Sequence, residues 1–228
     1  MASFMRWRYF ISSFLMSRGR DRFIRSLPAG ATLLDVGCGN NSPERVKIQR
    51  PDIHYVGIDI NDYNQSSFSL CCADEYITAD PANFSREIAL RKNHFDAVIS
   101  SHNLEHCEQP WDVLTAMLDS LKSGGSIYLS FPSEKSVLFP SRRGTLNFSD
   151  DPTHRFLPPF DTIADFMAAR GFSFPISTRR YRPPLLFLLG LMLEPIGFLT
   201  GRNMPWGSTW ALNGFESVIW ASKKDTAV

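Results

Sequence analysis

Four residues near the start of the chain have the types and spacing of a ligand-binding turn. Asp35 ends a short apolar stretch, Gly37 and Gly39 follow it, and a second acid, Asp59, ends the next apolar stretch. Glycine has no Cβ, so the main chain at these glycines can lie against a ligand. Open α/β sheets bind ligands where their strands end, and an acid about 20 residues after the glycines usually holds a ribose diol. The spacing therefore predicts a nucleoside-binding turn.

The glycine pattern distinguishes two kinds of cofactor. A nicotinamide dinucleotide site has a third glycine three residues after the second, whereas this chain has Ser42 there and Pro43 next. An acid two residues before the first glycine instead suits a ligand with a cationic ammonium group and no phosphate. The stretch 35–39 resembles motif I, D-x-G-x-G, of the class I S-adenosylmethionine-dependent methyltransferases. The alternative is a buried strand and tight turn in another α/β protein.

A second stretch resembles the same family. Residues 95–100, FDAVIS, predict a strand, and Leu104-Glu105-His106 follows it. This is similar to the F-D-x-V-x-S…L-E-H segment of methyltransferases that act on small molecules, and the resemblance, to the type 11-like small-molecule or glycan branch, covers residues 30–132. It implies that S-adenosylmethionine is the cofactor. The residues predicted to bind it are Asp35, Gly37, Cys38, Gly39, Asp59, Ile60, Asp80 and Ser100.

Asp80 has two interpretations of equal weight. It ends the predicted strand 75–79 and precedes Pro81. The resemblance places an adenine-contacting acid here, and a carboxylate can accept a hydrogen bond from the adenine amino group. The alternative is an aspartate that only initiates a turn before proline.

Two histidines are candidates for acid–base chemistry. Methyl transfer from a sulfonium is a direct displacement, for which the protein supplies orientation and electrostatics. A hydroxyl acceptor must also lose a proton, which a histidine of near-neutral pKa can accept. We predict His154, in the polar stretch 142–156 beside Asp150 and Asp151, as this base, and His102, after the strand 95–100, as the second candidate. The alternative is that these charged residues only pair with one another.

The arginines of the second half favour an anionic acceptor. Arginine binds phosphate or carboxylate with a planar fork. We predict methylation at oxygen of a small-molecule, glycan or lipid-linked acceptor, with a merely solvated basic surface as the alternative. Two other function classes remain: a cofactor-binding module without transfer, and a nucleic-acid methyltransferase. Residues 100–103, SSHN, stand where amino-directed nucleic-acid enzymes carry N-P-P-Y, so we expect no nucleic-acid partner. The arginines concerned are Arg142, Arg143, Arg155, Arg179, Arg180 and Arg182.

These residues require strands that end at one edge of a sheet. The resemblance and the apolar runs together predict a seven-stranded, mostly parallel, Rossmann-like α/β fold with an antiparallel last strand and helices on both faces. Helices are expected from Ser42, from Pro110 to a Gly124-Gly125 cap, and from Asp161 or Thr162 to Gly171, whereas residues 61–74 are expected to form a loop. The predicted strands are 33–36, 54–59, 75–79, 95–100, 126–131, 172–178 and 216–220.

Length and composition predict the number of domains and the kinds of partner. A chain of 228 residues predicts one domain, with a leading helix at 1–27, a cofactor half at 30–132 and an acceptor half at 133–228. A net charge of +1 implies no global affinity for nucleic acid. The four cysteines form no C-x-x-C pair, and no signal-peptide pattern is present, so we predict reduced thiols, no metal site and a cytoplasmic protein.

Two segments favour contacts beyond the sheet. Residues 1–27 combine an apolar helical stripe with arginines, which predicts a helix packed across the sheet, with a lid or membrane contact as alternatives. Residues 185–200 are apolar on every side but contain Glu194-Pro195 and are shorter than the roughly 20 residues that span a bilayer. For this insert, burial or a homodimer contact ranks above a peripheral membrane contact.

Overall fold

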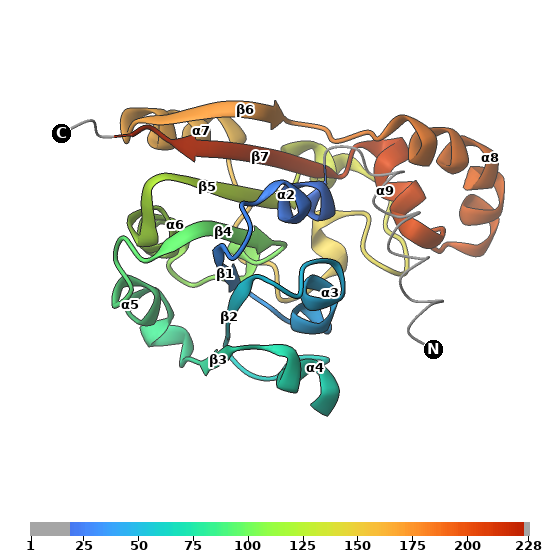
Figure 1. The fold of residues 1–228 in the computed structure, drawn as a ribbon. Coiled ribbons are helices and arrows are strands. Elements are labelled where there is room, and N and C mark those ends of the chain that lie inside the picture. The colour runs from blue at the N-terminus through green and yellow to red at the C-terminus, as the bar shows by residue number, and fades with distance from the viewer. Residues whose placement is uncertain (1–18, 226–228) are drawn as a thin grey trace.

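Seven strands form one sheet in the computed structural model, which describes residues 19–225 (Figure 1). Their order is β3-β2-β1-β4-β5-β7-β6, and β7 runs antiparallel to both of its neighbours while the pairs from β3 to β5 are parallel. This confirms the predicted fold class. The strands are β1 (Thr32–Val36), β2 (His54–Asp59), β3 (Glu75–Thr78), β4 (Phe95–Ser101), β5 (Leu121–Pro132), β6 (Phe172–Thr178) and β7 (Glu216–Lys223).

The burial of the strands follows their place in the sheet. Leu33, Leu34 and Val36 of β1 are buried because helices cover both faces of the parallel region, which is why β1 reads as a continuous apolar run. β6 lies at the sheet edge, and its side chains alternate between buried and exposed. Pro175 falls in the register shift of β6, a place that tolerates a residue without an N–H donor.

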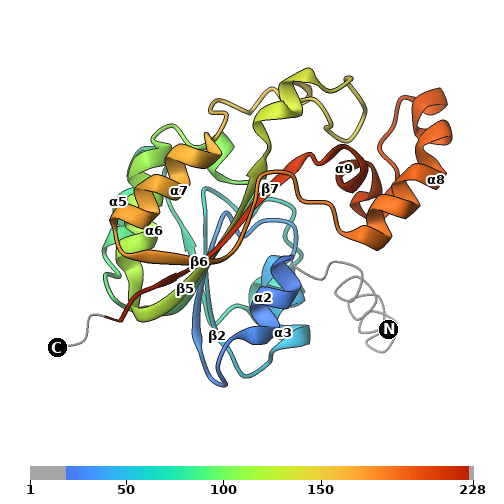
Figure 2. The same ribbon diagram turned by 90° about the horizontal axis from the view of Figure 1, so that it is seen from above.

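Two helical layers enclose the sheet. Figure 2 shows α2 (Arg20–Ser26) and α3 (Ser42–Gln49) on one face, and α5 (Phe84–Ala89), α6 (Pro110–Ser120) and α7 (Phe160–Ala169) on the other. Each layer has its own apolar cluster, built around Phe23 and Val46 on the first face and around Met117 and Ile163 on the second. Of the predicted leading helix, residues 1–18 lie outside the described part of the chain.

The apolar insert forms α8 (Pro184–Thr200), which packs on α9 (Ser208–Asn213) beyond the start of β7 (Figure 2). A Cβ at Gly190 would lie 2.4 Å from the Ser208 carbonyl oxygen, so glycine permits this close approach. Among the described residues, no helix combines the length and apolar character needed to cross a membrane. Several apolar side chains of α8 stay exposed: Leu185, Leu188, Leu191, Met192, Ile196, Phe198 and Leu199.

Three local predictions were wrong. Part of the expected loop 61–74 is the helix α4 (Ser67–Cys72), because the Ser66 hydroxyl accepts a hydrogen bond from the Ser69 N–H at 3.0 Å and caps it. Helix α6 ends at Ser120, and Gly124, with φ +73°, belongs to the irregular start of β5 rather than to a helix cap. Among the described residues no side-chain cap bond starts α3 or α7, because the predicted caps Ser42 and Asp161 lie inside these helices. The N-cap positions are held by Asn41, whose side-chain oxygen accepts from the Ser66 N–H instead, and by Pro159.

Short 3₁₀ helices complete the connections around the candidate site. They are η1 (Pro81–Asn83), η2 (Leu104–His106), η3 (Glu134–Leu138), η4 (Phe148–Asp150) and η5 (Pro205–Gly207). Of these, η2 follows β4 and η3 follows β5, so both connect to strand ends at the carboxyl edge of the parallel strands, and η4 comes next along the chain after η3. This is the edge at which such sheets bind ligands.

Candidate functional site

The turn after β1 meets the ends of β2 and β4. Gly37 has φ +77°, and a Cβ there would lie 2.6 Å from Asn103 Oδ1, so only glycine fits. A Cβ at Gly39 would lie 3.5 Å from Asp59 Oδ2. The predicted glycine turn, the predicted ribose acid and the segment after β4 therefore lie together at one edge of the sheet.

Asp35 has three donors within the chain. Its Oδ2 accepts from the Tyr55 hydroxyl at 2.6 Å, from Arg20 Nη2 at 2.9 Å and from the Ser42 hydroxyl, and the residue is 2% exposed. The sequence predicts a carboxylate that faces the ammonium group of the ligand. In the structure this carboxylate binds side chains of α2, α3 and β2 and so links these elements to β1. The contact of Asp35 with the ligand stays a prediction.

Asp59 keeps an accessible carboxylate beside the glycine turn. Its Oδ1 accepts from the Ile60 N–H at 2.7 Å. Burial raises its pKa, against the lowering effect of hydrogen bonds from the main-chain N–H groups of Ile60, Asn61 and Gly39. A carboxylate has several lone pairs, so Asp59 retains capacity to accept from ribose hydroxyls.

The other predicted cofactor residues differ in their burial and in their hydrogen bonds. Burial, together with the carboxylates of Asp35 and Asp59, raises the pKa of the Cys38 thiol, and the main-chain oxygen of Cys38 accepts from Gln65 Nε2 at 2.6 Å. Ser100 is 2% exposed, and its hydroxyl oxygen has no hydrogen-bond partner among the described residues. Asp80 and Ile60 are exposed, and the side chain of Asp80 makes no cap bond to η1.

His102 lies between two carboxylates. Its Nδ1 is 3.0 Å from Glu105 Oε1 and its Nε2 is 3.4 Å from Glu216 Oε1, while its ring packs 5.0 Å from the Trp210 ring. Burial lowers the pKa of His102, but the two carboxylates outweigh burial and raise it to about 10. A protonated imidazole cannot accept a proton, so this geometry favours His102 as a positioning residue over a base.

His154 keeps one ring nitrogen free for chemistry. Its Nδ1 lies 2.6 Å from the Phe148 carbonyl oxygen, which can only accept, so Nδ1 carries the hydrogen and Nε2 of the neutral ring keeps a lone pair. The ring stacks on Phe148, with the ring centroids 4.6 Å apart, and lies tilted against the His106 ring, with the centroids 4.8 Å apart. Of the two predicted carboxylate partners, Asp151 Oδ2 is 4.0 Å from Nε2, whereas Asp150 accepts main-chain N–H groups of Arg142, Leu146 and Asn147.

Glu105 ties these groups together, which the sequence does not reveal. It is fully buried, and its main-chain oxygen accepts from the N–H groups of Arg155 and Phe156 at 2.8 and 3.1 Å. These bonds hold the loop that carries His154 against η2. The L-E-H segment marks Glu105 as part of a family pattern, but contacts with a loop about 50 residues later leave no local signal.

Three of the six predicted acceptor-side arginines have carboxylate partners. Arg142, Arg155 and Arg179 pair with Glu194, Glu108 and Asp161 respectively.

Arg180 and Arg182 form a separate basic pair, and neither has a carboxylate partner among the described residues. Both donate to the Asn213 carbonyl oxygen, at 2.5 and 3.3 Å. Burial and the neighbouring Arg180 lower the pKa of Arg182. The pair flanks Tyr181, whose N–H donates to the Glu216 carbonyl oxygen at 2.6 Å, and thus lies next to the partner of His102.

Comparison with known proteins agrees with this geometry. Residues 6–174 match the model of a methyltransferase domain family. The chain belongs to this family. Its fold and membership confirm the predicted class I S-adenosylmethionine-dependent methyltransferase, with S-adenosylmethionine as cofactor.

Two similar proteins show how far the likeness extends. An uncharacterised protein of Methanocaldococcus jannaschii is 26% identical over 159 residues, covering 65% of this chain and 42% of that protein. Phosphoethanolamine N-methyltransferase 1 of Triticum aestivum is 29% identical over 131 residues, covering 52% of this chain and 25% of that protein. The chain thus spans less than half the length of these relatives.

A solved structure is similar over most of the chain. Phosphoethanolamine N-methyltransferase 2 of Haemonchus contortus, in complex with phosphomonomethylethanolamine and S-adenosylhomocysteine, has a TM-score of 0.57 and 14% identity, covering 90% of this chain and 51% of that one. At this identity the likeness establishes the fold alone.

Proposed function

We propose that this chain transfers a methyl group from S-adenosylmethionine to a hydroxyl oxygen of a small acceptor that carries an anionic group. The observation that carries the proposal is the convergence of the glycine turn, Asp59 and the η2 segment at one edge of the sheet. These parts are in close contact, because a Cβ at Gly37 would lie 2.6 Å from Asn103 Oδ1 and a Cβ at Gly39 would lie 3.5 Å from Asp59 Oδ2. The loop with His154 is hydrogen-bonded to the same segment.

The anionic group of the acceptor is assigned to Arg180 and Arg182. Two guanidinium groups without carboxylate partners among the described residues can bind a phosphate or carboxylate through paired hydrogen bonds. The residue between them, Tyr181, donates its N–H to the carbonyl oxygen of Glu216, whose carboxylate pairs with His102. A phosphorylated small molecule, or a sugar- or lipid-linked phosphate, fits this position.

A second candidate is methylation of an amine nitrogen in a phosphorylated amine. One small pocket beside the basic pair is lined by Tyr181, Trp210 and Glu216, two aromatic rings and a carboxylate. These groups stabilise a cationic ammonium through cation–π and charge interactions. The wheat and nematode proteins named above act, by their names, on phosphoethanolamine.

A screen of acceptor classes for release of S-adenosylhomocysteine tests the proposal and separates the candidates. Sugar phosphates, phospholipid headgroups, phosphorylated amines and RNA form the panel, and mass spectrometry of the product identifies the methylated atom. Methylated oxygen supports the proposal, and methylated nitrogen supports the second candidate. An absence of product with every class favours a cofactor-binding module without transfer, and a product on RNA favours the nucleic-acid alternative.

Replacement of Arg182 by alanine is expected to raise KM for an anionic acceptor about 10–100-fold with kcat little changed. A charge-assisted hydrogen bond contributes roughly 1.5–3 kcal/mol, and its loss in ground and transition states alike appears in KM. Arg182 is exposed, so the variant should fold. Arg86→Ala, at an exposed arginine of α5, is the matched control, and an unchanged KM for Arg182→Ala would move the anion site elsewhere.

Replacement of Asp59 by alanine is expected to weaken S-adenosylmethionine binding by about 10–100-fold. The carboxylate would accept hydrogen bonds from ribose hydroxyls, and charged acceptors contribute roughly 1.5–3 kcal/mol. Isothermal titration calorimetry measures the change, with Asp62→Ala, an exposed acid nearby, as the control. Equal affinity of Asp59→Ala and the wild type for S-adenosylmethionine would place the ribose at another residue. Tight binding of NADH by the wild type, without binding of S-adenosylmethionine, would contradict the predicted cofactor.

The exposed apolar side of α8 is proposed to be a contact between two copies of the chain, ahead of a peripheral membrane contact, in a cytoplasmic protein. Leu188 and Leu191 are 55% and 51% exposed, and exposed apolar patches more often bind protein. We expect a dimer by light scattering, and a monomer with an unchanged melting temperature in Leu188→Glu/Leu191→Glu. A wild-type monomer that floats with anionic vesicles in a salt-sensitive way would support the membrane contact instead.

A further inference from the structure

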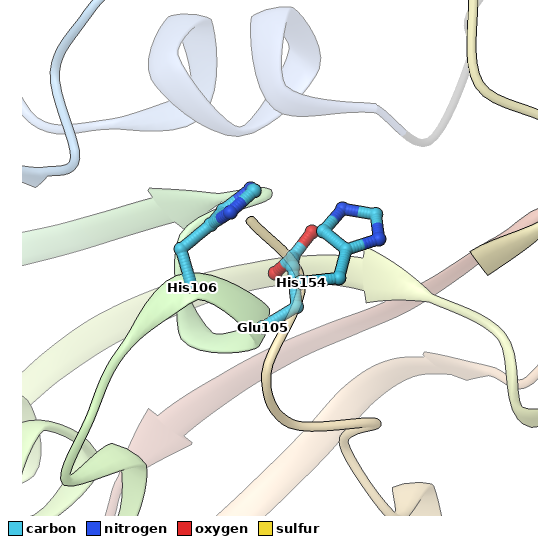
Figure 3. Close-up of side chains that lie close together, drawn as sticks. All are labelled: Glu105, His106 and His154. Carbon is cyan, nitrogen blue, oxygen red and sulfur yellow. The ribbon is translucent and has the colours of Figure 1, made fainter. Parts of the chain in front are cut away.

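Three potential metal ligands gather on the acceptor side of the sheet, outside the predicted cofactor residues. Glu105 and His106 come from η2, and His154 comes from the loop after η4. One ligand atom from each lies within 4.8 Å of the other two. Figure 3 shows the Glu105 carboxylate between the two imidazole rings.

The carboxylate of Glu105 has one oxygen with no hydrogen-bond partner. Oε1 lies 3.0 Å from His102 Nδ1, whereas the buried Oε2 has no hydrogen-bond partner among residues 19–225. Glu105 itself is 0% exposed. A buried charged oxygen without a partner is costly, so buried carboxylates are normally paired or coordinate a metal. A cation between Glu105 and the two histidines would satisfy this oxygen.

The hydrogen bonds of both histidines leave their Nε2 atoms free for a cation. The Thr153 hydroxyl donates to Asp151 Oδ1 at 2.6 Å, so it accepts from His106 Nδ1, which is 2.9 Å away. His154 Nδ1 donates to the Phe148 carbonyl oxygen. Histidines that bind metals are held in this way, with the second ring nitrogen donating to an oxygen of the protein.

We propose that Glu105 Oε2 and the Nε2 atoms of His106 and His154 bind a divalent first-row transition-metal ion. Imidazole with one carboxylate is the donor set of catalytic zinc sites and of other open metal sites. Ligands at about 2.1 Å from one ion lie at most about 4.2 Å apart, so side-chain shifts of roughly 1 Å would close the site. The carboxylate of Asp151, 4.0 Å from His154 Nε2, adds negative charge, and His102 orients Glu105 from its other oxygen.

This inference deepens the proposed function and rests on it for its role. Three protein ligands leave coordination positions open, as catalytic sites do. An acceptor hydroxyl bound there would have its pKa lowered by the ion and would lose its proton to solvent before attacking the methyl group. His154 would then serve as a ligand, and the chain would need no separate general base. The prediction of no metal site rested on the spacing of the cysteines, and no cysteine is a ligand of the site proposed here.

Titration of the metal-free full chain with Co²⁺, followed by absorption spectroscopy and calorimetry, tests the site without any acceptor. We expect equimolar binding with ligand-field bands and no sulfur-to-cobalt charge-transfer band. His154→Gln and Glu105→Gln should each weaken binding at least about 10-fold, the scale of losses at metal sites. His94→Gln, at an exposed histidine elsewhere, is the matched control and should bind as wild type. The melting temperature of each metal-free variant reports its folding.

Several outcomes would overturn the metal site. These are no binding, binding that survives in His154→Gln, and a charge-transfer band that disappears in Cys71→Ser or Cys107→Ser. Should Glu105→Gln fail to fold, His106→Gln and His154→Gln decide the question. The proposed function is tested separately, because methyl transfer that depends on His154 without metal binding would make His154 the base. Metal binding without methyl transfer to any acceptor would contradict the proposed function but not the metal site.

Discussion

Asp35→Ala is expected to lower the free energy of unfolding by about 3–5 kcal/mol, the usual loss when one partner of a buried ion pair is removed. The change leaves the guanidinium of Arg20, whose side chain is 16% exposed, without the carboxylate that it binds at 2.9 Å. It also leaves the hydroxyl of the fully buried Tyr55 without its acceptor. Within the described part of the chain, Arg20 would keep only its hydrogen bond to the Ser42 hydroxyl, and both groups would be desolvated without the carboxylate that they bind.

Urea unfolding followed by circular dichroism measures this loss. Glu75→Ala, which removes a more exposed ion pair with Arg91, is the matched control and should change stability far less. A loss for Asp35→Ala as small as for the control would mean that the buried network contributes little. The result also affects binding experiments, because weak cofactor binding by Asp35→Ala would then reflect unfolding as much as a lost contact.

The parallel core of the fold could be predicted because its strands are short, apolar and bounded by glycine, proline or aspartate. Strands β1, β2 and β4 are buried on both faces, so their composition alone identifies them. The antiparallel direction of β7 came from the family resemblance, because no local pattern encodes strand direction. Helix α4 escaped prediction because its six residues, SFSLCC, carry no helical periodicity and depend on the cap from Ser66.

The candidate site was predictable only where its residues are close in sequence to a strand end. The turn at Gly37 and the acid Asp59 follow strands directly, and the structure brings them together. The partners of these residues could not be predicted, because they depend on contacts between distant segments. Arg20 reaches Asp35 from another helix, and the loop with His154 attaches to Glu105 through main-chain hydrogen bonds.

His154→Ala is expected to lower kcat by about 10²–10⁴-fold while leaving S-adenosylmethionine affinity unchanged. The variant removes the only nitrogen of this ring that is free of a main-chain hydrogen bond, on the loop tied to η2. The glycine turn and Asp59 lie on other elements, so cofactor binding should be preserved. Single-turnover assays with the acceptor found by the screen, combined with calorimetry for the cofactor, measure both quantities.

His102→Gln distinguishes a reacting histidine from one that positions the site. His102 is held protonated between Glu105 and Glu216, so glutamine, which still donates one hydrogen bond, should retain much of the activity. His154→Gln has no such rescue, because an amide can neither accept a proton at neutral pH nor replace a metal-binding imidazole. Full activity in His154→Ala would reject His154 as the reacting histidine. Equal and large losses in both variants would instead indicate that the two histidines act only by positioning the η2 segment.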